Sequence, residues 1–293
     1  MKKTQSAFEP RQWHVAKSQL ITLGPQAVLM GIINATPDSF SDGGTNLEPQ
    51  RAAQNAATMV EQGALIIDIG AESTRPGAAE IDGDEEIGRL LPVIDAVVGA
   101  SKGALISVDT YRSSTAAIAL EAGAHIINDV WGLQREPELA AAVAAHGAGI
   151  VIMHTSRGRD MLSDVIEDQR VFFDASLSIA EKAGISDEQV VLDPGFGFGK
   201  DADDNYELMY RFEALQAFGL PLLAGTSRKR FIGAATGRET DERDIGTVAT
   251  TALLRAKGAA IFRVHNVAVN ADAARITDAM LAVSPARDHT DDQ

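Results

Sequence analysis

The sequence predicts an α/β chain that folds as a single (β/α)8 TIM barrel. Short runs rich in Val, Ile and Leu recur along the chain, and a helix-like stretch separates each run from the next. Such runs, without strict polar and apolar alternation, are typical of strands buried on both faces of a parallel sheet. Eight such strands close a barrel. The runs cover residues 28–34, 64–70, 104–110, 125–130, 149–155, 190–196, 221–227 and 259–265.

The chain ahead of the first run predicts a small separate element. Residues 13–23 (WHVAKSQLITL) have the composition of one or two short strands, and we expect this strand or hairpin to close the bottom of the barrel. Residues 1–27 are therefore an N-terminal extension and residues 28–284 the barrel, while the polar residues 285–293 are expected to be a disordered tail. No low-complexity linker divides the barrel, which argues for one domain.

The stretches between the runs have helical features. Residues 84–98 place apolar side chains at a 3.6-residue period, and Pro92 lies inside this stretch, where proline can kink a helix. Several stretches end in a glycine just before the next run, which favours a left-handed helix C-cap. These glycines are Gly63, Gly123, Gly147 and Gly258. The repeated ending supports a chain of βα units.

Composition excludes several classes of function. The chain has 293 residues, a formal net charge of −15 and no cysteine. The acidic charge argues against nucleic-acid and anionic-membrane partners, since both require clustered Lys and Arg. The absence of cysteine excludes disulfides, thiolate nucleophiles and cysteine-ligated metals. The N-terminal lysines have no apolar segment behind them, and no run approaches the roughly 18 apolar residues of a membrane span. We expect a cytoplasmic protein.

Polar and ionisable residues stand where the predicted strands end, and barrel enzymes place their chemistry at these ends. Asp109, Asn128 and Asp193 suit a planar heterocycle with several N–H donors along one edge, because a carboxylate accepts two such donors side by side. Capping of the following helix is the alternative for each of the three, but it explains them poorly as a set. The strand ends carry Asn34, Asp68, Asp109, Asn128, Asp129, His154, Asp193, Ser227, Arg263 and His265.

Basic residues gather at the last two strand ends. Arg228, Lys229 and Arg230 follow the seventh run, and Arg263 and His265 end the eighth. The corresponding loops of barrels often bind phosphate, so we predict a phosphate or diphosphate site there. Neutralisation of the acidic surface is the alternative, and it suffices for Arg230. At the end of the fifth run, the role of His154 stays open.

Loops rich in turn formers follow the first two runs. Residues 34–44 (NATPDSFSDGG) and 72–77 (ESTRPG) are interpreted as mobile covers that exclude water during group transfer; a solvated turn is the alternative for the first. Residues 194–200 (PGFGFGK) lack the spacing of nucleotide-binding glycine loops. Their glycines instead let the backbone approach a flat ligand, with Phe198 as a stacking or edge contact.

Taken together, these segments resemble the dihydropteroate synthases, a family of pterin-binding barrel enzymes of folate biosynthesis. The matches keep their order, cover every strand but the fifth, and include two specific loops. They are NATPDSFSDGG (34–44), DIGAESTRPG (68–77), SVDT (107–110), INDV (127–130), DPGFGFGK (193–200), GTSRKRFIG (225–233) and RVH (263–265). The resemblance implies attack of the 4-aminobenzoate amine on 6-hydroxymethyl-7,8-dihydropterin diphosphate, giving 7,8-dihydropteroate and diphosphate.

The resemblance also implies a pterin pocket at the strand ends. Its residues would be Asp109, Asn128, Met153, Asp193 and Lys229. The carboxylates and the amide would bind the edge of the ring, Lys229 would donate to the ring, and Met153 would line the pocket. This assignment agrees with the heterocycle site inferred from the residues themselves.

A diphosphate site with a metal is implied beside the pterin. Asn34, Arg75, Arg263 and His265 would bind the diphosphate, and Asn34 would contact Mg²⁺ that diphosphate oxygens and water otherwise hold. Asn34, Lys229, Arg263 and His265 would be the catalytic residues. An arylamine is already neutral and nucleophilic at pH 7, so the enzyme mainly stabilises the departing charge and aligns the two substrates.

An aminobenzoate slot beneath the mobile loops completes the implied site. It would be shaped by Thr74, Pro76, Phe198, Ser227 and Lys229. Both substrates are small molecules, and barrels of this kind often form homodimers through their outer helices, which we also expect here. The residues of the first mobile loop are Thr36, Pro37, Asp38, Ser39, Phe40, Ser41 and Asp42.

Some positions depart from the family pattern. Residues 154–160 (HTSRGRD) replace the usual Met-Gln-Gly-x-Pro segment after the fifth strand, and Ala35, Arg230 and Asn266 are milder differences. A non-catalytic pterin-binding paralogue is one alternative function. A methyltetrahydrofolate-dependent methyltransferase is another, but it has no need of the NATPDSFSDGG and SRKRFIG loops.

Overall fold

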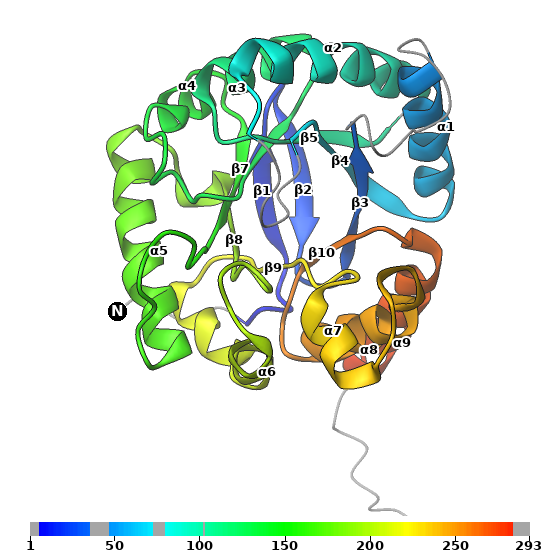
Figure 1. Cartoon of the computed structure of the whole chain (residues 1–293), viewed down its shortest axis with the longest axis vertical. Helices are drawn as coiled ribbons and strands as arrows, with labels where there is room; N and C mark the ends of the chain where they lie inside the picture. The colour runs from blue at the N-terminus through cyan, green and yellow to red at the C-terminus, as the bar shows by residue number, and fades with distance from the viewer. Residues whose placement is uncertain (1–5, 36–46, 73–79, 102, 284–293) are drawn as a thin grey trace, which may run out of the picture.

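Eight parallel strands form one sheet that curls into a nearly closed barrel, as predicted (Figure 1). The computed structural model describes residues 6–35, 47–72, 80–101 and 103–283. The strand order is β8-β7-β6-β5-β4-β3-β10-β9, and a parallel bridge between Leu192 and Leu222 joins β8 to the β9 side. The strands are β3 (Val28–Asn34), β4 (Ala64–Gly70), β5 (Leu105–Asp109), β6 (Ile126–Asp129), β7 (Gly149–Met153), β8 (Val190–Asp193), β9 (Leu223–Ala224) and β10 (Ile261–Val264).

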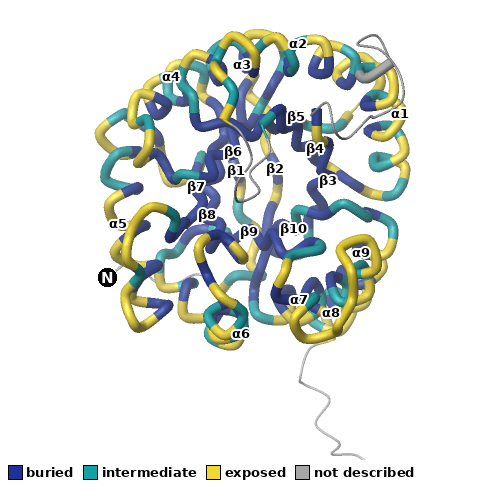
Figure 2. The backbone as a smooth tube through the Cα atoms, viewed as in Figure 1, coloured by how far each residue is buried: buried dark blue, intermediate teal, exposed yellow. Residues whose placement is uncertain are grey.

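Helices surround the barrel with their inner faces buried and their outer faces exposed (Figure 2). The helix predicted at residues 84–98 is α2, which begins after Asp82, continues past Pro92 and ends at Ala100. The Asp82 carboxylate accepts a hydrogen bond from the Glu85 backbone N–H (2.8 Å) and so caps the helix. The α-helices are α1 (Leu47–Glu61), α2 (Gly83–Ala100), α3 (Ser113–Ala122), α4 (Leu139–Ala145), α5 (Val165–Lys182), α6 (Ala202–Tyr210), α7 (Arg230–Thr236), α8 (Asp244–Ala256) and α9 (Val267–Leu281).

Short 3₁₀ helices complete the βα units, and the predicted glycines follow the ends of four α-helices. The 3₁₀ helices are η2 (Asp187–Gln189), η3 (Phe212–Phe218) and η4 (Thr240–Glu242). Positive φ angles occur at all four glycines predicted to end helices, so that prediction is confirmed. The largest of these angles is +132° at Gly123, directly after α3. The predicted order of βα units is therefore confirmed, but the strands predicted at 149–155, 190–196 and 221–227 end earlier, at Met153, Asp193 and Ala224.

The N-terminal residues form the predicted hairpin across the bottom of the barrel. Strands β1 (Arg11–Val15) and β2 (Gln19–Leu23) pair antiparallel, and they are seen through the ring of barrel strands in Figure 1. Lys17 and Ser18 form the turn with φ of +59° and +55°, the conformation that matches the twist of a tight hairpin. The Trp13 indole N–H donates to the Gln189 carbonyl oxygen (2.8 Å), which fixes the hairpin to the barrel.

Two apolar cores lie on either side of the barrel wall. The larger core fills the space between strands and helices. The smaller one fills the bottom of the barrel and is closed by hairpin residues. Those hairpin residues are Trp13, Val15, Ile21 and Leu23. They pack against the amino ends of the strands, so the apolar plug leaves the carboxyl ends for a site.

The tail expected at residues 285–293 lies outside the described residues, and the described helices finish with α9. Within the described ranges, no helix combines the length and apolar character needed to cross a bilayer.

Candidate active site

Hydrogen bonds at the carboxyl ends of β4, β5, β6 and β10 join five polar side chains. Asp68 accepts from Ser107 Oγ (2.6 Å) and Asn128 Nδ2 (3.3 Å). Arg263 Nε donates to Asp68 Oδ2 (2.6 Å), and its Nη2 donates to Asp109 Oδ2 (2.9 Å). The structure thus brings together three residues predicted for the site and adds Asp68 at their centre. We call these five residues the mouth network.

Burial dominates the electrostatics of the mouth network. It raises the pKa of Asp109 to about 7, even though the neighbouring Arg263 charge acts in the opposite direction. Burial also opposes the charge of Arg263, but Asp68 and Asp109 outweigh it and hold the arginine pKa above its usual value. Helix capping is the wrong interpretation for Asp109 and Asn128, because Arg112 and Glu138 stand at the caps of α3 and α4.

A second polar pair lies at the ends of β8 and β9. A Cβ added to Gly225 would lie 3.5 Å from Asp193 Oδ2 and 3.8 Å from Lys229 Nζ, so both groups face this glycine. Lys229 donates to the Phe196 carbonyl, while Asp193 accepts from the Gly195 backbone N–H (2.8 Å). Burial raises the pKa of Asp193. It also lowers the pKa of Lys229 to about 7, despite the opposing effect of the Asp193 carboxylate.

An apolar cluster borders these charges. Phe198, Met153 and Val130 pack together, and the partly buried Trp131 packs against them. Lys229 Nζ lies 4.4 Å from the centre of the Phe198 ring, and Arg157 Cζ lies at the same distance. The structure therefore places Phe198 and Met153 beside the polar groups, as predicted, and shows that Phe198 contacts cations.

Ser227, His265 and Asn34 lie toward the β9, β10 and β3 side of the mouth. Ser227 Oγ is 2.9 Å from His265 Nδ1 and accepts from the His265 backbone N–H (3.1 Å). His265 also lines a groove with Arg228 and residues of α1. Asn34 is exposed at the end of β3, which pairs with β10. The predicted diphosphate residues that the structure describes thus lie on neighbouring strands.

Other predicted residues fall outside the described chain. They are Thr36, Pro37, Asp38, Ser39, Phe40, Ser41 and Asp42 of the first loop and Thr74, Arg75 and Pro76 of the second. Among the described residues, no group of three or more His, Asp or Glu side chains is placed to hold a metal ion. Asn34 offers one hard oxygen ligand at the mouth, and Arg263 already engages the Asp68 and Asp109 carboxylates.

Sequence reasoning missed several residues of the mouth. Asp68 was noted at a strand end but given no role, although it is fully buried within an apolar run. A carboxylate in such a run is uncommon and is itself a signal of a specific partner. Arg157 was noted only as part of an atypical loop, and no pattern in that loop indicated its contact with Phe198.

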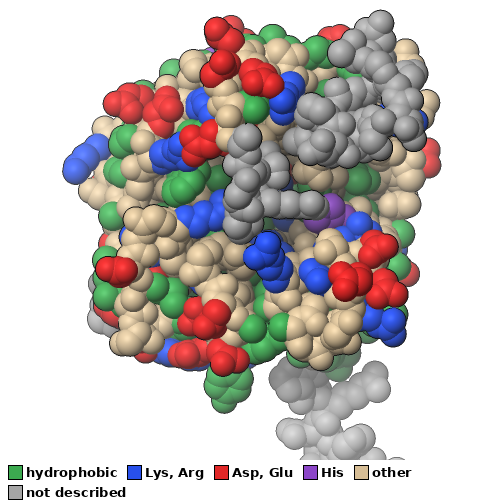
Figure 3. Space-filling view, in the orientation of Figure 1, with side chains coloured by type: hydrophobic (Ala, Val, Ile, Leu, Met, Phe, Trp, Pro, Cys, Tyr) green, Lys and Arg blue, Asp and Glu red, His purple; other side chains and the backbone are tan. Residues whose placement is uncertain are grey.

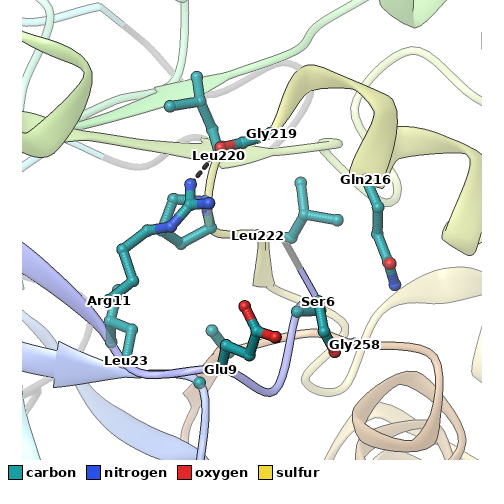
Figure 4. A pocket seen from close by; sticks show the side chains of 13 residues that line it. Ser6, Glu9, Arg11, Leu23, Gln216, Gly219, Leu220, Leu222 and Gly258 are labelled. Atoms are coloured by element: carbon teal, nitrogen blue, oxygen red, sulfur yellow. Dashed lines mark hydrogen bonds between the residues drawn. The ribbon is translucent and has the colours of Figure 1, made fainter. Parts of the chain in front are cut away.

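A cavity at the opposite end of the barrel is too small for a substrate (Figure 4). Its volume is about 30 Å³, roughly the space of one water molecule. Arg11 donates to the Gly219 carbonyl at its edge, and Glu9, Leu23 and Gln216 also line it. In the space-filling view down the barrel, Lys, Arg and His side chains are instead visible around the centre of the mouth (Figure 3).

Known pterin-binding enzymes are similar to this chain over most of its length. The pterin binding enzyme family matches residues 30–265. A dihydropteroate synthase of Bacillus subtilis is 44% identical over 284 residues, which cover 94% of this chain and 96% of the relative. The structure of a Xanthomonas albilineans dihydropteroate synthase with 4-aminobenzoic acid has a TM-score of 0.87 at 39% identity and covers 93% of this chain and 100% of that chain. The same organism's enzyme in complex with 7,8-dihydropteroate has a TM-score of 0.82 at 34% identity, covering 92% and 99%.

The barrel with polar and charged side chains at its mouth, together with the family match over residues 30–265, defines a pterin-binding enzyme. Within that class, the chain belongs to the dihydropteroate synthase family, whose members are transferases.

Proposed function

We propose that this chain condenses 6-hydroxymethyl-7,8-dihydropterin diphosphate with 4-aminobenzoate, releasing diphosphate and 7,8-dihydropteroate. The observation that carries the proposal is the mouth network beside Asp193 and Lys229. It concentrates carboxylates, an amide and cations in a buried space, as recognition of a polar heterocycle requires. The aminobenzoate and dihydropteroate bound by the Xanthomonas enzymes support both substrates.

The pterin is held by Asp109, Asn128, Asp193 and Lys229, with Met153 lining the pocket. A dihydropterin presents an amino group, a ring N–H and a carbonyl oxygen along one edge. The carboxylates accept from the N–H groups, and Lys229 donates to an acceptor of the ring. Asp68 is fully buried and bonded to Asn128 and Arg263, so it orients these two residues toward the pterin.

The diphosphate is held by Asn34, Arg75, Arg263 and His265. Arg263 uses Nε and Nη2 in the mouth network, which leaves Nη1 to donate to the leaving group. The Asn34 carboxamide oxygen suits Mg²⁺, a hard cation that takes its remaining ligands from diphosphate oxygens and water. When bound, Mg²⁺ neutralises charge on the diphosphate and makes it a better leaving group.

The aminobenzoate lies between Phe198, Ser227 and Lys229, with Thr74 and Pro76 from the second loop. Phe198 supplies an apolar surface for the aromatic ring, and the Ser227 hydroxyl can donate to the carboxylate. The predicted role of residues 36–42, which lie outside the described residues, is to exclude water during the transfer. Two aromatic substrates then meet with the amine in line with the departing diphosphate.

The chemistry needs little acid-base help from the protein. The dihydropterin ring stabilises a cation-like carbon as the carbon–oxygen bond to diphosphate breaks. The neutral arylamine then forms the new carbon–nitrogen bond and releases its proton to solvent. Arg263 and His265 stabilise the departing negative charge, and the pterin pocket keeps the reacting carbon in place.

A homodimer through α8 and α9 is part of the same proposal. Ile245 and Leu253 lie eight residues apart on α8, and Ile276 and Met280 lie four apart on α9. All four are exposed, so each pair forms an apolar stripe on one helix face. A second copy can cover such a face with its own stripe, as twofold dimers do. Light scattering of wild type and of Ile245→Glu should give a dimer and a monomer, and a monomeric wild type at micromolar concentration would contradict the dimer.

The reaction is tested with dihydropterin diphosphate and labelled 4-aminobenzoate, with Mg²⁺ present or removed by a chelator. Metal-dependent formation of labelled dihydropteroate is the expected result. Folded protein that binds the pterin without making product would instead identify a non-catalytic paralogue. Product formation that is unchanged by the chelator would contradict the Mg²⁺ assignment.

A further inference from the structure

A buried pair of basic side chains connects the two loops that follow β7 and β8. His154 comes directly after β7, and its ring is fully buried, 4.7 Å from the ring of Phe172. Lys200 Nζ lies 2.8 Å from His154 Nδ1 and donates to the Gly195 carbonyl (3.1 Å). The pair therefore links the loop after β7 to the glycine-rich loop after β8.

Asp168 fixes the orientation of the histidine. Its Oδ2 lies 2.9 Å from His154 Nε2, and the same carboxylate accepts from Arg159 Nη1 and Nη2 (2.8 and 2.6 Å) and from the Leu162 backbone N–H (2.9 Å). Arg159 Nη2 also lies 2.9 Å from His154 Nε2, but its hydrogen bond goes to Asp168 Oδ2. With the Nε2–H donating to the same carboxylate, Nδ1 is the acceptor for Lys200. Burial lowers the pKa of His154 to about 4, which keeps the ring neutral as this arrangement needs.

The loop after β7 and the loop after β8 are also in direct backbone contact. The Ser156 backbone N–H donates to the Phe198 carbonyl (3.2 Å). A Cβ on Gly195 would meet the His154 carbonyl oxygen at 1.8 Å, and one on Gly199 would meet the Ser156 carbonyl carbon at 2.7 Å. Such close packing means that a shift of the first loop is transmitted to the second.

We propose that His154 and Lys200 are a positioning pair that sets the Gly195–Gly199 loop, and through it the Phe198 wall of the aminobenzoate slot. The inference rests on the proposed function for the identity of that substrate. Lys200 Nζ donates to the Gly195 carbonyl, and Lys229 Nζ donates to the Phe196 carbonyl. The segment that carries Phe198 is thereby held on both sides.

The charges around Lys200 explain why its hydrogen-bond partner is a neutral histidine. Lys200 is nearly fully buried; Lys229 and Arg159 oppose its charge, and Asp193 and Asp168 favour it. Burial, the largest effect, and Lys229 lower the pKa of Lys200 to about 7. A protonated His154 would add another positive charge to this group, whereas the neutral ring accepts from Lys200 and donates to Asp168.

Steady-state kinetics separate positioning from general structural support. In Lys200→Met we expect KM for 4-aminobenzoate to rise about 10-fold, while KM for the pterin diphosphate changes less than about 2-fold. His154→Leu should have the same effect, and the double variant should be no worse than either, because the pair acts as a unit. His154→Asn, whose amide oxygen can replace Nδ1 as acceptor, should recover most of the loss. Exposed Lys182→Met is the matched control.

Hydrogen exchange tests the same pair without depending on turnover. Amides of residues 193–200 should exchange about 10-fold faster in Lys200→Met, whereas the β1–β2 hairpin should be unchanged. Unchanged exchange at 193–200, or an equal rise of both KM values, would overturn the positioning role. A wild type that makes no product, with the exchange difference intact, would refute the proposed function alone.

Discussion

The two ends of the barrel are built from opposite kinds of residue. At the bottom, Trp13 and Leu23 of the hairpin are buried among the apolar amino ends of the strands. At the mouth, Asp109, Arg263 and Lys229 are buried or partly buried among other charges. Burial of apolar area stabilises a fold by about 25 cal/mol per Å², whereas buried ion pairs contribute little net stability. Apolar packing at the bottom therefore supplies folding stability, whereas the buried charges at the mouth contribute to binding and add little stability.

Two arginines, the partly buried Arg263 and the fully buried Arg255, give the sharpest test of this division. Arg263→Ala should lower kcat/KM about 1,000-fold, because it removes a donor to the leaving group and disorders Asp68 and Asp109. Arg255 on α8 is fully buried and bonds Asp278 and the Gly24 carbonyl, but it lies away from the mouth. Each variant is measured for activity and for urea unfolding.

Arg255→Ala should lose about 3–5 kcal/mol of unfolding free energy, as expected when a buried ion pair loses one partner. Its kcat/KM, corrected for the folded fraction, should stay within about 2-fold of wild type. Comparable losses of activity in both variants would show that the two ends are not separable.

The hairpin provides the matching test at the bottom. Trp13 is 1% exposed and its indole N–H bonds Gln189, so Trp13→Ala should lower the unfolding free energy by about 3–5 kcal/mol. Pterin affinity of the folded variant should be unchanged. Calorimetric binding below the unfolding transition checks this, and a weakened affinity would mean that the plug shapes the mouth.

The contrast between the ends also explains what the sequence could reveal. All eight strands were predicted because an apolar run recurs in each βα unit, and a terminal glycine ends four of the helices before them. Six of the eight runs were predicted too long at their carboxyl ends, and the runs at 149–155, 190–196 and 221–227 were too long by two or three residues. Apolar runs report burial, and the chain stays buried after β7, β8 and β9 have stopped pairing.

The positions of the candidate site residues could be predicted from the sequence, but the hydrogen bonds among them could not. Strand-end position identified Asp109, Asn128 and Arg263, since all parallel strands of a barrel end at one mouth. The Asp68–Arg263 pair joins residues 195 positions apart, and no local pattern specifies such a partner. The sequence left the role of His154 open and indicated none for Lys200, because their contact depends on packing between two loops.

Opposed pKa shifts at the mouth predict an optimum of pterin binding near pH 7. Burial raises the pKa of Asp109 to about 7 and lowers that of Lys229 to about 7. Protonated Asp109 loses acceptor capacity at lower pH, and neutral Lys229 donates less well at higher pH. Affinity for 6-hydroxymethylpterin should fall about 10-fold toward both pH 5.5 and pH 9. Trp131 fluorescence in a Trp13→Phe background measures it, and a flat profile would contradict both assignments.

The same shifts show that the mouth costs stability at neutral pH. Because its pKa is raised, Asp109 makes its full contribution to folding stability only at pH values below the ordinary pKa of an aspartate. That contribution is lost as pH rises through about 7. Because its pKa is lowered, Lys229 makes its full contribution to folding stability only at pH values above the ordinary pKa of a lysine. That contribution is lost as pH falls through about 7. Near pH 7 neither group retains its full contribution, whereas the apolar bottom has no comparable pH dependence.

The smallest expected effect concerns the hairpin turn, where stability can be added without touching the mouth. Ser18 has a φ of +55°, a conformation that costs an L-residue about 1 kcal/mol and glycine almost nothing. Ser18→Gly should therefore raise the unfolding free energy by about 0.5 kcal/mol, since greater freedom of glycine in the unfolded chain offsets part of the gain. Urea unfolding measures the change, with activity as the control. A stabilised variant with unaltered kinetics would show that the bottom of the barrel can be strengthened independently of binding, and any change in KM would show that the two ends communicate.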